Sequence, residues 1–289
     1  MKVFVTGASG FIGQAVATAL VARGHHVRGL IRDPDKRSAT VALGIEPVMG
    51  VLDNAALLTR EARQADVVVN AADSDHRGAA EALLEGLRGS GNALLHTSGS
   101  SIVSDQAMGE PSERLFYENT PIEPLPDKVA RVAIDQLVLT APDVRSVVLC
   151  CTMLYGHRDW RARASARPPA YIGRGLNRWS NAHIDDAAEL YCLALEKAEP
   201  GTFLYVESGE EELGLLARHA ATLLGLPHAH ALDPTYAVEM LGREVAVFAL
   251  GSNSRVRGAI GRDLLGWRPR HHSIVKWLDT ADDESRPYV

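Results

Sequence analysis

The sequence predicts an α/β protein built on a doubly wound parallel sheet, with helices on both faces. Two observations carry this prediction. In the first half of the 289-residue chain, short apolar runs alternate with segments of helical period, and this alternation requires crossover connections between parallel strands. In addition, the glycine-rich stretch VTGASGFIG directly follows the first apolar run, where a strand would turn into a helix.

The expected strands and helices of the first half follow one another regularly. Short apolar runs that indicate buried strands lie at residues 2–5, 26–31, 45–48, 66–69, 93–96 and 146–149. Segments with apolar residues three and four apart, which indicate helices, lie between them at 11–23, 53–63, 78–88 and 127–139. Each helix would carry the chain from one parallel strand to the next.

After residue 150 the alternation is looser. Residues 155–181 are rich in Arg, Gly and Pro and are expected to be irregular. Beyond them we expect a helix, a strand and a second helix, at residues 184–198, 201–208 and 211–225. Because these segments are too short for a core of their own, we expect two parts. Residues 1–150 would form the main domain, and residues 151–289 a small lobe built on the same core, whose chain returns to the sheet.

Composition and charge argue against several classes of protein. Hydrophobic residues make up 46% and charged residues 23%, as in ordinary globular proteins, and the net charge of −6 gives no reason to expect nucleic-acid binding. No run approaches the roughly 18 apolar residues of a membrane span. The three cysteines contain no CxxC pair, and the histidines lack a metal-ligand spacing. We therefore expect a cytoplasmic protein without nucleic-acid, membrane or metal partners.

The glycines of the first turn indicate a phosphate site. A backbone that approaches a phosphate closely cannot carry a Cβ, and a helix that starts there directs free N–H groups at the anion. The stretch therefore predicts a dinucleotide pyrophosphate site at Thr6, Gly7, Ser9, Gly10, Phe11, Ile12 and Gly13. Its spacing is GxxGxxG rather than GxGxxG, and a tight turn without a ligand is the alternative.

TGASGFIG resembles the fingerprint of the short-chain dehydrogenase/reductase superfamily, in its extended or atypical, NAD-dependent epimerase/dehydratase-like branch. Further stretches resemble that family in the same order along the chain: NAA (70–72), HTSGSS (96–101), MLYG (153–156), NAHIDDAAELYCLAL (181–195) and LLGWRPRHHS (264–273). The resemblance spans nearly the whole chain. It implies a Rossmann-type fold and a nicotinamide cofactor, which Ala71 and Ala72 would also contact.

The turn after the second expected strand bears on the choice of cofactor. Arg32 comes first and could pair with the 2′-phosphate of NADP(H), whereas Asp33 could hold the ribose hydroxyls of NAD(H). We favour NADP(H), with NAD(H) as the second choice. The family often has Asp directly after a glycine that follows the third strand. Here Gly50 is followed by Val51, and Asp53 is the cofactor-side acid that we expect.

The catalytic pattern departs from that of the family. Its hydride-transferring members use Ser or Thr, Tyr and Lys, with Tyr four residues before Lys, and the Tyr exchanges the proton of the substrate oxygen. By resemblance, Ser98 matches the serine, although Ser100 and Ser101 compete for the role. Lys128 matches the lysine, which would also hold the cofactor. Pro124 then stands where the tyrosine belongs, so the usual acid is absent.

A replacement acid is expected from outside the usual helix, with Tyr155 or Tyr117 ahead of His96. With such an acid, the chain would be an NAD(P)-dependent oxidoreductase or epimerase. Without one, it would be a non-catalytic sensor or regulator that binds the same cofactor.

The substrate side is indicated by charge. An irregular segment crowded with arginines would suit a small polar or anionic substrate, and the residues expected to bind it are Ser100, Tyr155, Arg158 and Arg178. A solvated loop is the alternative. The family also predicts a possible homodimer formed through the helices at 78–88 and 127–139.

Overall fold

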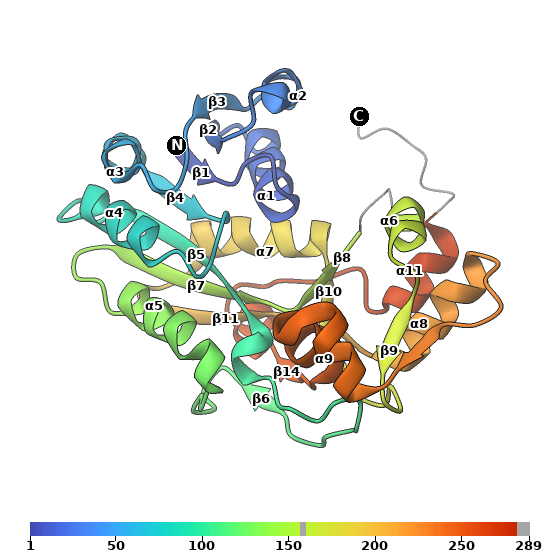
Figure 1. Ribbon diagram of the computed structural model, residues 1–289. Coiled ribbons are helices and arrows are strands. Elements are labelled where there is room, and N and C mark those ends of the chain that lie inside the picture. Colours follow the sequence, from blue (N-terminus) through green and yellow to red (C-terminus); the bar gives the residue numbers. More distant parts are fainter. Residues whose placement is uncertain (157–159, 282–289) are drawn as a thin grey trace.

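The computed structural model describes residues 1–156 and 160–281. Its centre is a sheet of seven parallel strands in the order β11-β7-β5-β4-β1-β2-β3 (Figure 1). These strands are β1 (Lys2–Thr6), β2 (His26–Ile31), β3 (Glu46–Met49), β4 (Val67–Asn70), β5 (Ala93–Gly99), β7 (Arg145–Cys151) and β11 (Thr202–Val206). The predicted doubly wound parallel sheet is confirmed, and its edge strand β11 comes from the second half of the chain.

Helices cover both faces of the sheet (Figure 1). On one face lie α1 (Phe11–Ala22) and α7 (Ile184–Lys197), which pack against each other. On the other lie α3 (Ala55–Arg63), α4 (Arg77–Leu87) and α5 (Val129–Leu139). Because side chains alternate along a strand, each strand serves two cores: Val3 and Val5 face α1 and α7, whereas Phe4 joins the core on the other side.

Local chemistry accounts for the starts of the helices. Asn54 caps α3 by accepting a hydrogen bond from Leu57 N at 3.0 Å. The helix expected at 127–139 begins instead at Val129, after the 3₁₀ turn Pro126–Lys128. Among the segments of this half that were not predicted are the 3₁₀ turn Pro34–Lys36 and α2 (Arg37–Ala42).

The expectation that residues 155–181 are irregular was wrong in part. They contain α6 (Trp160–Ala166), β9 (Ala170–Ile172) and the start of β10 (Arg178–His183). β10 pairs with β8 (Met153–Tyr155) on one side and β12 (Gly209–Glu212) on the other. Its strand conformation depends on partners elsewhere in the chain, and local sequence does not reveal them.

Short elements complete the structure beside the sheet. They are the 3₁₀ turn Ser100–Val103, β6 (Phe116–Tyr117), α8 (Leu213–Leu223), β13 (His230–Leu232), α9 (Pro234–Arg243), the π-helical turn Glu244–Gly251, β14 (Val256–Arg257), α10 (Ala259–Asp263) and α11 (Ile274–Thr280). Within residues 1–156 and 160–281, no helix combines the length and apolar character needed to cross a membrane.

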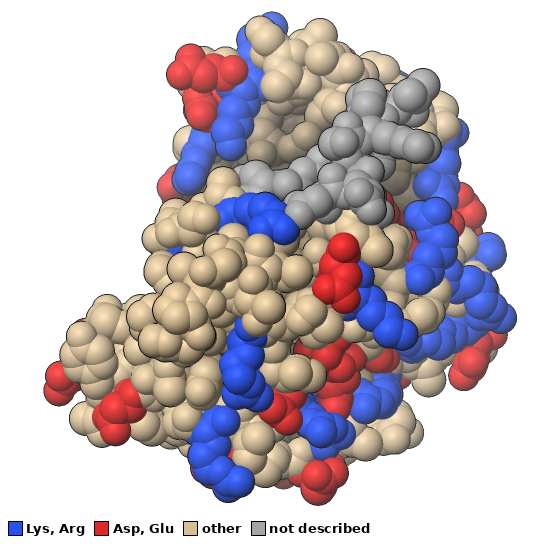
Figure 2. Space-filling view, turned by 90° about the vertical axis from the view of Figure 1, so that its right-hand side faces the viewer, with Lys and Arg blue, Asp and Glu red and all other residues tan. Residues whose placement is uncertain are grey.

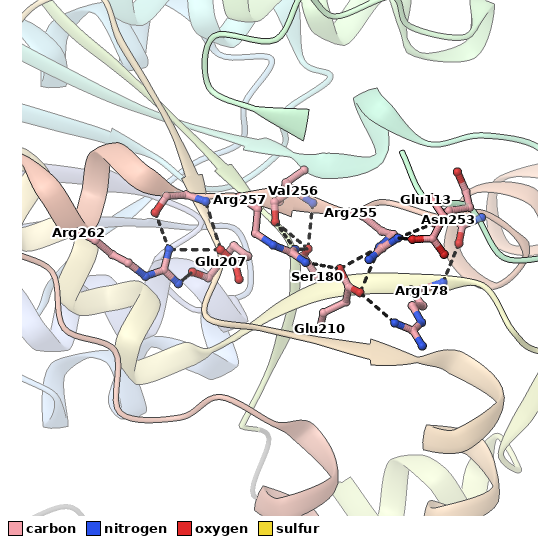
Figure 3. A network of polar contacts seen from close by, with 12 residues as sticks. Glu113, Arg178, Ser180, Glu207, Glu210, Asn253, Arg255, Val256, Arg257 and Arg262 are labelled. Carbon is pink, nitrogen blue, oxygen red and sulfur yellow. Dashed lines mark hydrogen bonds and ion pairs between the residues drawn. The ribbon is translucent and has the colours of Figure 1, made fainter. Parts of the chain in front are cut away.

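A cluster of charged side chains around Glu210 links several strands beside the sheet (Figure 3). The Glu210 carboxylate on β12 accepts hydrogen bonds from Arg255 Nε at 3.1 Å and Arg257 Nη2 at 3.0 Å, and Arg178 Nη1 lies 3.7 Å away. Burial acts to raise the pKa of Glu210, but the hydrogen bonds from Arg255 and Arg257 outweigh it and hold the pKa below its usual value. The cluster thus joins β10, β12 and β14.

We expect Glu210→Gln to lower the free energy of unfolding by about 2 kcal/mol, because Arg255 would keep a buried charge without its main counterion. Urea unfolding at pH 7 measures this. Glu212→Gln on the same strand is the matched control. Its carboxylate pairs with the half-exposed Arg218, and its removal should cost less than about 0.5 kcal/mol. Equal losses in the two variants would contradict the role given to the cluster.

Candidate functional site

A groove follows the carboxyl ends of the central strands. Its outer part is a cavity of about 560 Å³ between the turn after β1, the end of β2 and the loop after β4. Its inner part is a cavity of about 300 Å³ between the start of α1, the end of β5 and the end of β7. The two parts adjoin, because both are lined by Ala71, Ala72 and Asp73.

The glycine turn forms a cradle at the middle of the groove. Gly7 has a φ of +67°, and a Cβ there would lie 2.8 Å from Ala72 Cα. A Cβ on Gly13 would lie 2.2 Å from the carbonyl oxygen of Gly7. Gly10 caps α1 and lines the outer cavity, so the positive end of the helix is directed at the groove. This bare backbone at a helix N-terminus fits a pyrophosphate, as the sequence predicts.

The end of β2 carries positive charge. Arg32 and Lys36 both line the outer cavity, and Arg32 is exposed. Asp33 lines it too, but Asp33 Oδ1 accepts a hydrogen bond from Asp35 N at 3.0 Å and so caps the following turn. Asp53 also lines this cavity, and its Oδ1 lies 3.1 Å from Nε2 of His76.

Behind the groove, a row of polar side chains crosses three neighbouring strands. Thr6, Asn70 and His96 stand opposite one another in the strand register. Thr6 Oγ1 donates to Asn70 Oδ1 at 2.7 Å, so the Asn70 amide nitrogen donates to His96 Nδ1 at 3.0 Å. This leaves the ring hydrogen of His96 on Nε2. Burial, together with the nearby Arg131, lowers the pKa of His96 to about 4, so the imidazole is neutral.

The row ends at a buried carboxyl group on α5. Ser98 is one of the residues that line the inner cavity, and its Oγ donates to Asp135 Oδ2 at 2.6 Å. His96 Nε2 lies 3.7 Å from Asp135 Oδ1, but burial favours the neutral form of both groups. Burial raises the pKa of Asp135 to about 7 against the opposing effect of the Ser98 hydrogen bond.

The basic residue of α5 that reaches the end of β5 is Arg131. Arg131 Nη1 donates to Ser101 Oγ at 2.8 Å, its Nε donates to Asp75 Oδ1 at 2.8 Å, and its other nitrogen also pairs with Asp75. Lys128 faces elsewhere. Its Nζ lies 2.5 Å from Glu244 Oε1 and 4.4 Å from the centre of the Phe248 ring.

The tyrosine candidates lie away from the inner cavity. Tyr155 is buried, with its ring against His183 and Trp277, and burial raises its pKa. Tyr117 is exposed on β6, beside β14. Ser100 is buried and accepts a hydrogen bond from Ser254 Oγ at 2.9 Å. Among the residues described here, those lining the inner cavity include no tyrosine, lysine or histidine.

Two arginines of the segment expected to bind the substrate lie near carboxylates. Arg178 points toward Glu210 (Figure 3), and Arg174 pairs with Glu110 at 3.1 Å. Arg158 lies outside the described residues. On the face shown in Figure 2, basic side chains lie beside acidic ones over much of the surface. The role of these arginines in substrate binding remains a prediction.

Comparison with known proteins places the chain in a family. The model described as "NAD dependent epimerase/dehydratase family" matches residues 3–204. The chain belongs to this family. The resemblance to the extended short-chain dehydrogenases/reductases is thereby confirmed, and with it the NAD(P)-dependent cofactor class of the family.

The relatives of this chain carry different names. An uncharacterized protein of Schizosaccharomyces pombe is 28% identical, covering 98% of this chain and 99% of that protein. A 3-diazoavenalumate denitrifying reductase of a Streptomyces species is 27% identical, covering 96% and 98%. A dTDP-glucose 4,6-dehydratase of Streptomyces venezuelae, solved with NAD bound, has a TM-score of 0.76 at 19% identity, covering 99% and 98%. At that identity the likeness shows the fold alone.

Two residues behind the inner cavity, Arg131 and Asp135, were not predicted from the sequence. A signal was available, because they stand four apart in a helix whose neighbouring residues are mainly apolar, so they lie on one side of it. The resemblance to the family directed attention to Lys128 instead.

We expect Gly10→Val to abolish dinucleotide binding while the protein stays folded. A Cβ at position 10 would meet only the carbonyl oxygen of Gly7, at 3.1 Å, but the added methyl groups would stand at the wall of the phosphate cradle. Calorimetric titration with NADPH measures the loss. Gly78→Val, also near a helix N-terminus but outside the cavity lining, is the control. Unchanged affinity of Gly10→Val would refute the site.

We also expect Asp135→Asn to change how stability depends on pH. Since the pKa of Asp135 is raised to about 7, the folded protein keeps a proton that the unfolded chain loses above about pH 4. Its contribution to stability is therefore full at low pH and falls as the pH rises toward 7. The free energy of unfolding of the wild type, minus that of the variant, should fall by about 1 kcal/mol per unit from pH 5 to 7. Asp143→Asn, at an exposed position, should show a constant difference.

Proposed function

We propose that the protein is an NADP(H)-dependent oxidoreductase that reduces a carbonyl group of a small polar substrate. The observation that carries the proposal is the continuous groove, which leads from Arg32 and Lys36 past the glycine cradle to Ser98. Family membership supports the cofactor class, and a relative named as a reductase supports the direction of the reaction.

The chain supplies contacts along the whole length of such a cofactor. The cradle between Thr6 and Gly13 would hold the pyrophosphate, and Arg32 with Lys36 would hold the 2′-phosphate. Asp53 would stand on the adenine side, and Ala71 and Ala72 would line the middle of the groove. When bound, the reduced nicotinamide supplies a hydride. Phe11, Ile12 and Thr152 line the inner cavity where that end would lie.

The chain's own residues would orient and polarise the substrate. Ser98 Oγ would donate a hydrogen bond to the carbonyl oxygen. Its neighbour Thr97 is fixed from the opposite face of the sheet, because Thr97 Oγ1 lies 2.7 Å from the hydroxyl of Tyr191 on α7. Lys128 is not assigned a role in this proposal, since Glu244 and Phe248 hold its Nζ. Pro124 remains the position where the family tyrosine is absent.

One observation favours a second function, that of a non-catalytic sensor of the cofactor. The described lining of the inner cavity offers no tyrosine, lysine or histidine as an acid. Tight binding of NADPH without turnover of carbonyl probes would decide for the sensor. Turnover would decide for the oxidoreductase.

Assembly and location remain predictions. The described helices α4 and α5 expose Arg77, Glu81 and Glu85 together with one large apolar side chain, Val129. A homodimer through these helices would therefore be partly polar, and light scattering at micromolar concentration would test it. A cytoplasmic setting remains the expectation from the sequence.

We expect wild-type protein to bind NADPH more tightly than NADH, and Arg32→Ala to weaken NADPH binding by about tenfold or more while NADH binding stays nearly unchanged. The reason is the loss of a charged hydrogen bond to the 2′-phosphate. Fluorescence titration with each cofactor measures both constants. Arg37→Ala, in the same turn but outside the cavity lining, is the control. A wild-type preference for NADH would contradict the assignment.

A further inference from the structure

We propose that Asp135 is the proton reservoir of the reaction and that Ser98 passes its proton to the substrate oxygen, in place of the missing tyrosine. This inference rests on the proposed carbonyl reduction. It assigns the acid to a carboxyl group behind the cavity wall, on the same helix as Arg131, and not to a side chain that enters the cavity.

The geometry places Ser98 between the cavity and Asp135. Ser98 is one of the residues that line the inner cavity, and its Oγ lies 2.6 Å from Asp135 Oδ2. Asp135 itself is 2% exposed and packs on α5 between the buried Ile134 and Val138. In the proposed relay, a proton of Asp135 passes to the cavity through the Ser98 hydroxyl.

The charges around Asp135 leave its carboxyl group largely uncompensated. Arg131, on the same helix, is engaged by Asp75 from the loop after β4. His96 on β5 is neutral. The remaining titratable neighbours are neutral as well, because burial raises the pKa of both Cys150 on β7 and Tyr205 on β11. The Ser98 hydrogen bond alone does not offset this burial, so the acid form persists to about pH 7.

The protonated form also sets the direction of the hydrogen bonds. When Asp135 is ionised, the Ser98 hydroxyl must donate to it. When Asp135 is protonated, its own O–H donates to Ser98 Oγ, and the serine proton is free to point into the cavity. The neutral carboxyl thus prepares Ser98 to donate to a substrate oxygen.

The transfer step balances in atoms and charge. Hydride addition at the carbonyl carbon, which the proposed function supplies, leaves a negative charge on the substrate oxygen. The Ser98 O–H bond breaks as a new O–H bond forms on that oxygen, and the Asp135 O–H bond breaks as Ser98 Oγ regains its proton. The product is an alcohol and the negative charge ends on Asp135, which is reprotonated from solvent before the next turnover.

The test compares wild type with Asp135→Asn and Ser98→Ala, using isatin and ethyl acetoacetate as carbonyl probes and NADPH as reductant. Wild-type turnover should fall as the pH rises above about 7, where Asp135 ionises. Asp135→Asn should lose about a hundredfold in turnover and lack this pH dependence, with the dissociation constant for NADPH kept within about twofold. Asp143→Asn, the same change at an exposed position, should behave as wild type.

A second measurement does not depend on turnover. Infrared difference spectra should show a protonated carboxyl that titrates near pH 7 in wild type and in Asp143→Asn and that is absent in Asp135→Asn. In Ser98→Ala its pKa should rise further, because the hydrogen bond to the ionised form is lost. A merely structural Asp135 would not link the turnover profile to this titration.

The outcomes separate the two proposals. Probe turnover that Asp135→Asn leaves unchanged in rate and pH profile would overturn the proton relay and leave the oxidoreductase standing. The absence of any carboxyl titrating near pH 7 would do the same. NADPH binding by wild type without turnover of either probe would overturn the carbonyl reduction, and the relay with it.

Discussion

The parallel register of β1, β4 and β5 is the constraint on which the site depends. It sets Thr6, Asn70 and His96 side by side at the same level of three neighbouring strands. All three side chains are buried, and hydrogen bonds from Thr6 to Asn70 and from Asn70 to His96 link them. Because parallel strands end at one edge, the same register brings the glycine turn after β1 and Ser98 at the end of β5 to one groove. A slip of one residue would turn the row to the other face.

Because side chains alternate along β5, this strand contacts both layers of helices. His96 and Ser98 face α5, where both lie near Asp135 and Ser98 donates a hydrogen bond to it. Thr97 faces α7 and contacts Tyr191. One strand thus contributes to a polar cluster on one side and is anchored on the other. A buried carboxyl on α5 is tolerated because it is neutral over much of the pH range and because Ser98 meets one of its oxygens.

Helix α5 shows why the basic residue expected from the family resemblance differs from the one found near the end of β5. The family pattern points to Lys128, but that residue belongs to the 3₁₀ turn that precedes the helix. Its ammonium group forms an ion pair with Glu244 and lies over the ring of Phe248. Both residues belong to a segment more than a hundred residues further along the chain. Arg131 lies in the first turn of the helix and reaches Ser101 and Asp75. No local pattern specifies which basic residue meets the end of β5, since distant partners decide it.

The sequence by itself determined the alternating elements, the parallel sheet and the phosphate cradle. Each follows from local physics: the periodicity of buried side chains, and the need for a bare backbone at Gly7 and Gly13. The tertiary structure alone decided that β10 is a strand, that Tyr155 packs against Trp277, and that Asp135 lies behind Ser98. Those outcomes depend on contacts between residues far apart in the chain, and the burial that shifts the pKa of Asp135 exists only once the sheet and α5 have packed together.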